Sequence, residues 1–384
     1  MRFAQHCSIV TLALCAAFTG CSGNGASDTT GSTGSTSPTG STSGTGGATT
    51  DCSTAGGTSL ALTVCAANAL LATLSADQKK TVNLAFTDTK NRTSWSNLPT
   101  GITARPGAKM GDLSATSQDA AIALMKTVLS TAGQSDLIGV RAADGYLGTM
   151  QQGYGVGLYY IAIFGTPSTT GDWAIMFGGH HMAYNITIAA GTPYVTPNHI
   201  AVEPKAEFTF EGNTYAPLID EGAALIKMFN ALSPTELASA YLTGQSFMDV
   251  LIGPVEYQTG SLAAVTAKYP TGSNRTGILV SKLSADQQAL VTAAISAWVK
   301  DFIGDISDKL VADYTSADAY ADTYIAFGGP NATSIDVETS GTYMRIDGPR
   351  AWIEVSCQGG IVIQGKTHYH TIYRDKKLDY SGKL

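Results

Sequence analysis

Hydrophobic and polar positions along the chain follow two spacings, and each spacing predicts one kind of element. Between residues 285 and 299 the apolar positions recur every three or four residues, which is typical of an amphipathic helix. The same spacing predicts helices at 118–129 and 221–232. Three segments begin with Leu-Ser and continue with an acid or amide in the first helical turn, and each predicts a capped helix start: 74–78, 232–236 and 283–287.

Other stretches are continuously apolar and rich in β-prone residues, and they predict hairpins. Residues 157–165 and 172–178 are separated by a turn-rich segment and predict the first hairpin. Residues 324–330 are similar in sequence to 160–167 and are followed by two further strand-like segments, 342–346 and 351–356. This repetition has two interpretations, which are an internal duplication of a helix-plus-hairpin unit and a chance similarity of short strand motifs.

Together these elements predict an α+β fold in which helices pack on an antiparallel sheet. The globular part is expected at residues 51–384, a length that is ample for a large hydrophobic core. If the chain is duplicated, the two related lobes are expected at residues 74–230 and 231–384.

The N-terminal residues differ in composition from the rest and predict export. Arg2 precedes an apolar run from 8 to 18, which is too short to span a bilayer and is typical of a signal peptide at residues 1–20. Residues 18–21 (FTGC) resemble a lipobox, with Phe in place of the more usual Leu, so we expect a lipid on Cys21. Ordinary cleavage with release of a soluble protein is the alternative.

A tether is expected behind the lipid anchor. Residues 21–50 are almost entirely Gly, Ser, Thr, Ala and Asn, and such a composition cannot bury enough apolar surface to offset the entropy of ordering. The sequence therefore predicts a lipid-anchored protein of the cell envelope that faces the periplasm or the cell exterior. The lipid anchor is the expected contact with the membrane.

Charge and motifs exclude several classes of function. The net charge is −7 and only 14% of residues are charged, without the Lys/Arg cluster that phosphate neutralisation requires, so we expect no nucleic-acid partner. The sequence has no Gly-x-Ser-x-Gly elbow, phosphate-binding loop, His-Glu-x-x-His helix or Cys-x-x-Cys pair. A small-molecule ligand is compatible with this composition.

The cysteines beyond the predicted tether are Cys52, Cys65 and Cys357. Cys52 and Cys65 flank a Gly-Gly pair at a spacing that can close a small loop, and an oxidising compartment permits the bond, so we expect a disulfide between them. Cys357 is then expected to be a free thiol buried in a strand.

Histidines provide the strongest chemical signal, because four of the six in the chain lie in two tight groups. His180 and His181 follow two glycines, which allow the backbone to turn. His368 and His370 are two apart in a strand-like segment and therefore point to the same face. If the hairpins pack side by side, these imidazoles can bind one transition-metal ion, Zn²⁺, Cu²⁺ or Fe²⁺. The alternative is that each pair is a hydrogen-bonded structural element, and the isolated His199 is expected in a loop.

Glu354 is the acidic residue with the most interpretations. Alternation along the strand places it on the same face as Trp352, where it could be a metal ligand, a partner for a histidine N–H or a general base. Its structural alternative is an ion pair with an arginine, for which the candidates are Arg345, Arg350 and Arg374. In contrast, two acids at 220–221 are expected at a helix start because of the helix dipole alone.

Several motifs together resemble a known family. They are WSNLP at 95–99, RPG at 105–107, FGGHH at 177–181, RIDGPR at 345–350, HYH at 368–370 and YRD at 373–375. In this order they resemble the bacterial family of domains of unknown function numbered 3500, over about residues 74–384. The resemblance implies no activity, and it implies that seven residues match the family's recurring pattern: Trp95, Arg105, His180, His181, Arg350, His368 and His370.

Two classes of function follow from the histidines. The first is a metal-dependent hydrolase or oxidoreductase in which His180, His181, His368 and His370 hold the ion and Glu354 or a tyrosine assists proton transfer. The second is a non-catalytic lipoprotein that captures a metal or a small molecule. An open coordination position would favour the enzyme, whereas a closed four-ligand site would favour structure or storage.

Overall fold

A computed structural model describes residue 52 and residues 58–384 of the chain. The predicted signal peptide, Cys21 and the tether lie outside these described residues. No helix in the described part of the chain is long and apolar enough to cross a membrane.

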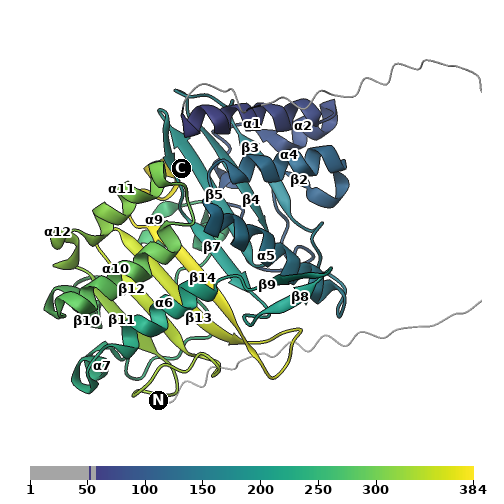
Figure 1. The fold of residues 1–384 in the computed structure, drawn as a ribbon. Coiled ribbons are helices and arrows are strands. Elements are labelled where there is room, and N and C mark those ends of the chain that lie inside the picture. The colour runs from purple at the N-terminus through teal and green to yellow at the C-terminus, as the bar shows by residue number, and fades with distance from the viewer. Residues whose placement is uncertain (1–51, 53–57) are drawn as a thin grey trace, which may run out of the picture. The chain divides into compact units, whose positions relative to one another are not determined.

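A sheet of 12 strands forms the centre of the molecule, and all its strand pairs are antiparallel except β1 with β3 (Figure 1). The path through the sheet is β1-β3-β4-β5-β7-β14-β13-β12-β11-β10, with β2 beside β3 and β6 beside β5. The first half comprises β1 (Asn83–Leu84), β2 (Ala108–Lys109), β3 (Tyr160–Phe164), β4 (Trp173–Gly179), β5 (Met182–Ala189), β6 (Thr192–Tyr194) and β7 (Asn198–Val202). The second half comprises β10 (Ile278–Leu279), β11 (Tyr324–Gly328), β12 (Tyr343–Asp347), β13 (Ala351–Gly359) and β14 (Thr367–Asp375), while β8 (Phe208–Phe210) and β9 (Asn213–Tyr215) form a separate hairpin.

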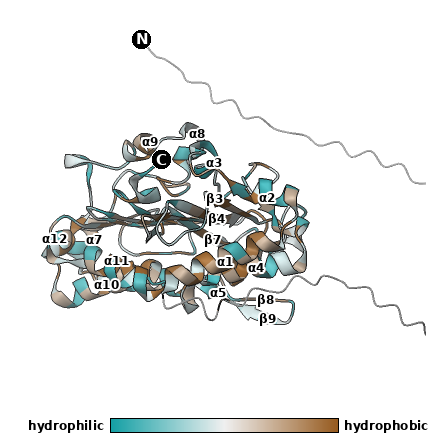
Figure 2. Cartoon of the chain, turned by 90° about the horizontal axis from the view of Figure 1, so that it is seen from above, coloured by the Kyte–Doolittle hydropathy of each residue, from teal (hydrophilic) through white to brown (hydrophobic). Residues whose placement is uncertain are grey.

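Helices cover one face of the sheet, and loops with short helices cover the other (Figure 2). The helical layer contains α1 (Ser59–Thr73), α4 (Ala115–Lys126), α5 (Thr131–Gly148), α6 (Ile219–Asn230), α10 (Ala285–Val299) and α11 (Gly304–Thr315). The opposite layer contains α3 (Thr89–Arg92), α8 (Val255–Thr259) and α9 (Leu262–Thr266). The remaining helices are α2 (Ala76–Val82), α7 (Pro234–Ala240) and α12 (Ala317–Tyr320). The α+β prediction is therefore confirmed.

The predicted hairpins and helix starts are present. β3 pairs with β4, and β12 pairs with β13, both antiparallel. The capping residues Ser75, Ser233 and Ser284 each form a full capping box with the side chain three positions later.

The same arrangement of elements occurs twice along the chain. α1 packs against α4 as α6 packs against α10, and β2 precedes α4 as β10 precedes α10. Gly107 and Gly277 lie just before β2 and β10, and both touch the neighbouring strand closely. A Cβ added to Gly107 would lie 2.2 Å from the Ile161 oxygen, and one added to Gly277 would lie 2.5 Å from the Ile325 oxygen. This is the arrangement that an internal duplication predicts.

The segments that are most similar in sequence do not occupy equivalent places in the two halves of the fold. Residues 283–288 correspond to 113–118, since Gln118 and Gln288 each donate from the side-chain amide to the carbonyl of the leucine five residues earlier, at 2.9 Å. Residues 74–78 correspond instead to 232–236, because each follows the helix that packs on α4 or α10. The predicted lobe boundary at 230/231 separates α6 from the helix on which it packs, and both halves contribute to one continuous sheet.

Candidate functional site

His180 and His181 form the turn of the β4–β5 hairpin. Gly179 pairs with Met182, which leaves these two residues between the strands. His181 has a φ of 62°, an uncommon conformation for a residue with a side chain, and such conformations concentrate at functional sites. Its amide donates to the Asn97 carbonyl at 3.1 Å, and its carbonyl accepts from the Ala201 amide at 2.7 Å. The turn is therefore fixed from both sides.

The glycines before the turn are required by close packing rather than by backbone freedom. Neither Gly178 nor Gly179 has a positive φ. A Cβ added to Gly179 would lie 2.7 Å from the Tyr159 ring, and one added to Gly178 would lie 2.6 Å from the Met182 carbonyl oxygen. The two glycines thus allow the hairpin to lie close against its neighbours.

Three histidines converge, and we refer to His181, His368 and His370 as the histidine triad. His368 and His370 lie on the same face of β14, as predicted. The Nε2 atom of His370 lies 3.1 Å from Nε2 of His368 and 3.3 Å from Nε2 of His181. Ligands about 2.0–2.1 Å from a tetrahedral metal ion lie roughly 3.3 Å from one another. The triad has the spacing of three ligands to one ion.

Burial favours the metal-binding protonation state of His181 and His368. All three side chains are buried. Burial, and secondarily the charge of the neighbouring imidazoles, lowers the pKa of His181 well below its usual 6.5, and the same causes lower the pKa of His368 to about 3. Neutral imidazole is the form that coordinates a metal ion, so neither ring has to lose a proton on binding at neutral pH.

Asp249 orients one ring of the triad. Its Oδ1 lies 3.0 Å from Nδ1 of His370, on the side of the ring opposite to the other histidines. An Nδ1–H that donates to this carboxylate leaves the Nε2 lone pair free for a metal, which is the usual partner arrangement of metal-binding histidines. The side-chain amides of Gln358 and Asn97 lie 2.9 and 3.4 Å from the same Nδ1. Asn97 lies in the WSNLP motif at 95–99, whereas Asp249 and Gln358 belong to none of the motifs found in the sequence.

His180 lies beside the triad and has a different partner. Its ring stacks on that of His181 with centroids 3.6 Å apart, and its Nδ1 lies 2.7 Å from Oδ1 of Asp144 in α5. In the triad, one ring nitrogen of each histidine lies within 4.8 Å of the other two, and His180 is not part of this group. The structure therefore brings together three of the four predicted ligands.

His199 lies in β7, so its assignment to a loop was wrong. It is fully buried, its ring centroid is 5.7 Å from that of His370, and both ring nitrogens lack a hydrogen-bond partner among the described residues. Burial and, secondarily, the neighbouring His370 lower its pKa to about 3. The Pro-Asn pair before it suggests a turn, but pairing of β7 with β5 and β14 extends the strand to Asn198.

Glu354 anchors a loop. Its two carboxylate oxygens accept from the backbone amides of Leu251 at 2.9 Å and Ile252 at 3.0 Å, and one of them also accepts from the Tyr343 hydroxyl. The Glu354 carboxylate is not grouped with the triad histidines as a potential metal ligand. It also forms no ion pair with a described arginine or other described residue. Glu354 therefore has a structural role, since the two amides that it binds lie two and three positions after Asp249 in the loop.

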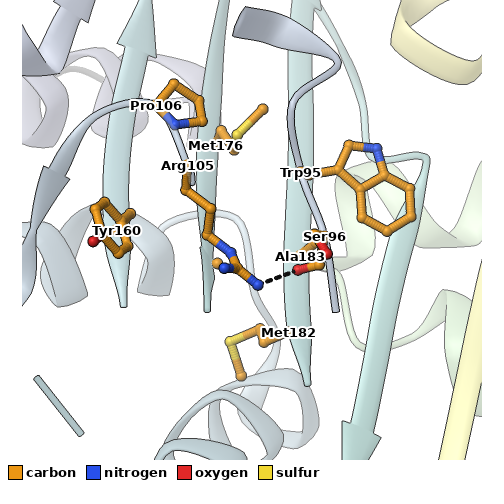
Figure 3. A pocket seen from close by; sticks show the side chains of 9 residues that line it. Trp95, Ser96, Arg105, Pro106, Tyr160, Met176, Met182 and Ala183 are labelled. Carbon is orange, nitrogen blue, oxygen red and sulfur yellow. Dashed lines mark hydrogen bonds between the residues drawn. The ribbon is translucent and has the colours of Figure 1, made fainter. Parts of the chain in front are cut away.

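Three other residues of the family pattern also stabilise the surroundings. Trp95 Nε1 donates to Glu256 at 2.9 Å and to the Tyr380 hydroxyl at 2.7 Å. Arg105 donates to the carbonyl of Ser96 at 2.7 Å and of Gly179 at 2.9 Å, which holds the 96–105 loop against the end of β4 (Figure 3). Arg350 forms ion pairs with aspartates: Asp313 and Asp375.

The cavity beside Arg105 is small. It is lined by residues that adjoin the site in sequence, including Ser96, Gly178 and Met182 (Figure 3), and has a volume of about 10 Å³. A volume of this size accommodates about one water molecule. None of the three triad histidines lines this cavity.

None of the three described cysteines is a ligand in the triad group, and Cys357 lies opposite Tyr369 in the helix-covered core. Cys52 and Cys65 are joined by a disulfide, and Cys357 is a free, buried thiol in β13.

The comparisons with known proteins agree with the resemblance inferred from the motifs. Residues 57–382 match the sequence model of a family described as "Protein of unknown function (DUF3500)". The match begins somewhat before residue 74 and includes the whole triad. No curated protein and no solved structure matches the chain.

Proposed function

The chain belongs to the DUF3500 family, and we propose that it is a metal-dependent enzyme that holds Zn²⁺, Cu²⁺ or Fe²⁺ between His181, His368 and His370. The observation that carries this proposal is the convergence of three buried Nε2 atoms at separations of 3.1 and 3.3 Å. Three imidazoles suit these borderline ions and suit Mg²⁺ or Ca²⁺ poorly, since those ions prefer oxygen.

The number of ligands favours an enzyme over a structural site. No fourth His, Cys, Asp or Glu of the described chain belongs to the group formed by the triad. Three protein ligands leave a coordination position for water or substrate, as in catalytic sites. A bound zinc ion would activate water for hydrolysis there, and copper or iron would react with oxygen, so the two reaction classes are hydrolysis and oxidation.

Each part of the surroundings has a defined task in this proposal. Asp249 holds the His370 ring, the backbone contacts of the hairpin turn hold His181, and burial keeps the imidazoles of His181 and His368 neutral. Glu354 holds the loop that carries Asp249 and takes no proton from a substrate, since both of its oxygens are occupied.

A second candidate function is non-catalytic metal binding, and one observation favours it. The three imidazoles of the triad are only 5%, 1% and 6% exposed. A carrier or storage protein needs no space for a substrate.

The experiment that tests the proposal is metal analysis followed by a test of the open position. Purified protein should contain about one equivalent of zinc, copper or iron. After exchange for Co²⁺, the visible absorption should change when azide is added, because a free coordination position accepts the anion. A protein that binds none of these metals contradicts the proposal, and a cobalt spectrum unaffected by azide favours the non-catalytic alternative.

We also propose that the protein is anchored to the cell envelope through a lipid on Cys21, on the basis of residues 18–21 and the tether composition. Cys21→Ala should move the protein out of the membrane fraction and stop labelling by a radioactive fatty acid. A wild-type protein that is soluble and unlabelled contradicts the anchor.

A further inference from the structure

A second group of potential metal ligands lies in the helical layer. Asp136 of α5, Glu221 of α6 and Asp301 just after α10 each offer a carboxylate oxygen within 4.8 Å of the other two. Their exposed fractions are 6%, 4% and 0%. The triad lies on the other face of the sheet, since His368 and His370 alternate with Tyr369, which packs in the helix-covered core. The carboxylates therefore form a separate site, which we call the carboxylate cluster.

No protein cation compensates this cluster. None of the three carboxylates forms an ion pair with a described Lys, Arg or His, although the pairs found elsewhere include buried ones such as Arg374 with Glu256. Asp136 accepts one hydrogen bond, from the Leu218 amide at 2.9 Å. Both oxygens of Asp301 lack any partner among the described residues. Buried carboxylates without a partner are costly, and proteins normally pair them or coordinate a metal ion with them.

A neutral oxygen beside the cluster also lacks a partner. Tyr184 of β5 is fully buried, and its hydroxyl forms no hydrogen bond with the described residues. Its ring packs edge-on against Phe302, the residue after Asp301, with centroids 6.3 Å apart. Burial, and then the charges of the three carboxylates with Asp301 first, raises the pKa of this phenol well above 10, so its hydroxyl stays neutral.

We propose that the carboxylate cluster binds a calcium ion, with Asp136, Glu221 and Asp301 as ligands and the Tyr184 hydroxyl as an additional oxygen. Calcium takes six to eight oxygen ligands, and three carboxylates can supply up to six. Magnesium usually retains several waters, for which a position this deeply buried has little room. The absence of nitrogen and sulfur from the cluster disfavours the metals that suit the triad.

Protons are the competitor for this site. Burial, and secondarily the charge of Asp136, raises the pKa of Glu221 to about 8, and burial raises the pKa of Asp136 to about 6 although the Leu218 amide donates to it. Because α5 belongs to the first repeat and α6 and α10 to the second, the ion would connect the two repeats and stabilise the whole fold.

The test is thermal unfolding of the full chain with calcium or with EGTA, together with the calcium content of dialysed protein. We expect about one equivalent of calcium and a melting temperature several degrees higher in calcium than in EGTA. Asp301→Asn keeps the shape of the side chain but removes its charge, and it should abolish both effects. His368→Ala is the matched control, because it disrupts the triad and should leave the calcium response intact.

Each other outcome overturns the proposal. Wild-type protein that binds no calcium, or that melts at the same temperature in calcium and in EGTA, means that the carboxylates share protons instead. The same holds if Asp301→Asn retains the calcium response. If this variant does not fold, Tyr184→Phe removes only a neutral ligand and should weaken calcium binding several-fold. An unchanged affinity in Tyr184→Phe excludes this hydroxyl as a ligand, and an unchanged affinity in Glu221→Gln, which removes a carboxylate charge, excludes the cluster as the calcium site.

Discussion

Individual histidines of the site differ in what they contact, and this difference can be tested by substitution. His181, His368 and His370 share the candidate ion, whereas Nδ1 of His180 pairs with Asp144. His368→Ala should remove most of the bound transition metal, because a lost ligand leaves its position to water. His180→Ala should retain it. Metal content measured on both purified variants distinguishes a triad from the four-histidine site that the sequence predicts, since that site would lose metal in both.

The two aspartates beside the histidines provide a matched pair. Asp249 contacts the triad residue His370 at 3.0 Å, and Asp144 contacts His180 at 2.7 Å. Asp249→Asn should lower zinc affinity by roughly 10- to 100-fold, the usual effect of removing a carboxylate that orients a metal-binding histidine. Asp144→Asn is the control and should leave affinity unchanged. Competition with a chromophoric chelator measures both values, and equal affinities would show that Asp249 has no such role.

The sequence predicts only those site residues that cluster with others of the same chemical type along the chain. The two histidine groups are visible because they are clustered in a chain poor in histidine. Asp249 and Asp136 are single acids in unremarkable segments, and only tertiary packing brings them to their partners. The sequence explains Glu221 by the helix dipole alone. In the structure Glu221 is buried beside Asp136 and Asp301, and burial is the main cause of its raised pKa.

At the level of elements, the loop that carries Asp249 depends on Glu354 in β13. The carboxylate accepts two backbone amides at 2.9 and 3.0 Å, and an amide side chain can accept only one of them. Glu354→Gln should therefore lower the free energy of unfolding by about 1–3 kcal/mol, the cost of an unsatisfied buried group. Urea unfolding measures this loss. Asp249→Asn serves as the contrast, since it should weaken metal binding without a comparable loss of stability, and a stable Glu354→Gln protein would contradict the anchoring role.

Helix starts that depend on neighbouring residues can be predicted from the sequence. Which helix of one repeat is equivalent to which helix of the other cannot. The capped starts at Ser75, Ser233 and Ser284 follow from nearest neighbours in sequence, and all three are present. The identity between residues 74–78 and 283–287 reflects the shared demands of a capping box rather than equivalent places in the fold. The strand β7 was missed because the Pro-Asn pair before His199 suggests a turn and because its partner β14 comes from a distant part of the chain.

For the whole molecule, the repeated arrangement of elements places the candidate metal site where its two halves meet. β7 of the first repeat pairs with β14 of the second at the middle of the sheet, with Asn198 opposite Tyr373 (Figure 1). His181 comes from the first repeat, and His368 and His370 come from the second. One repeat alone therefore cannot supply the triad.

The buried histidines at this junction should also make the stability of the metal-free protein depend on pH. His199 has a folded pKa of about 3, against about 6.5 for an unfolded histidine, so the unfolded chain takes up more protons between these values. Stability from this residue is thus complete above pH 7 and falls as the pH decreases toward 3. Acids with raised pKa values, such as Asp379 at about 6, have the opposite effect on the total, because there the folded state binds more protons.

Comparing the wild type with His199→Phe separates the contribution of His199 to the pH dependence of stability from the contribution of these acids. The variant keeps an aromatic ring and removes the titrating group, so the wild type should lose about 2 kcal/mol of unfolding free energy relative to the variant between pH 7 and pH 5. Urea unfolding in a chelator at the two pH values measures this difference, and the chelator is needed because a bound metal would itself compete with protons at the triad. Parallel pH dependences would mean that the ring of His199 is protonated in the folded state and that this part of the junction is open to water.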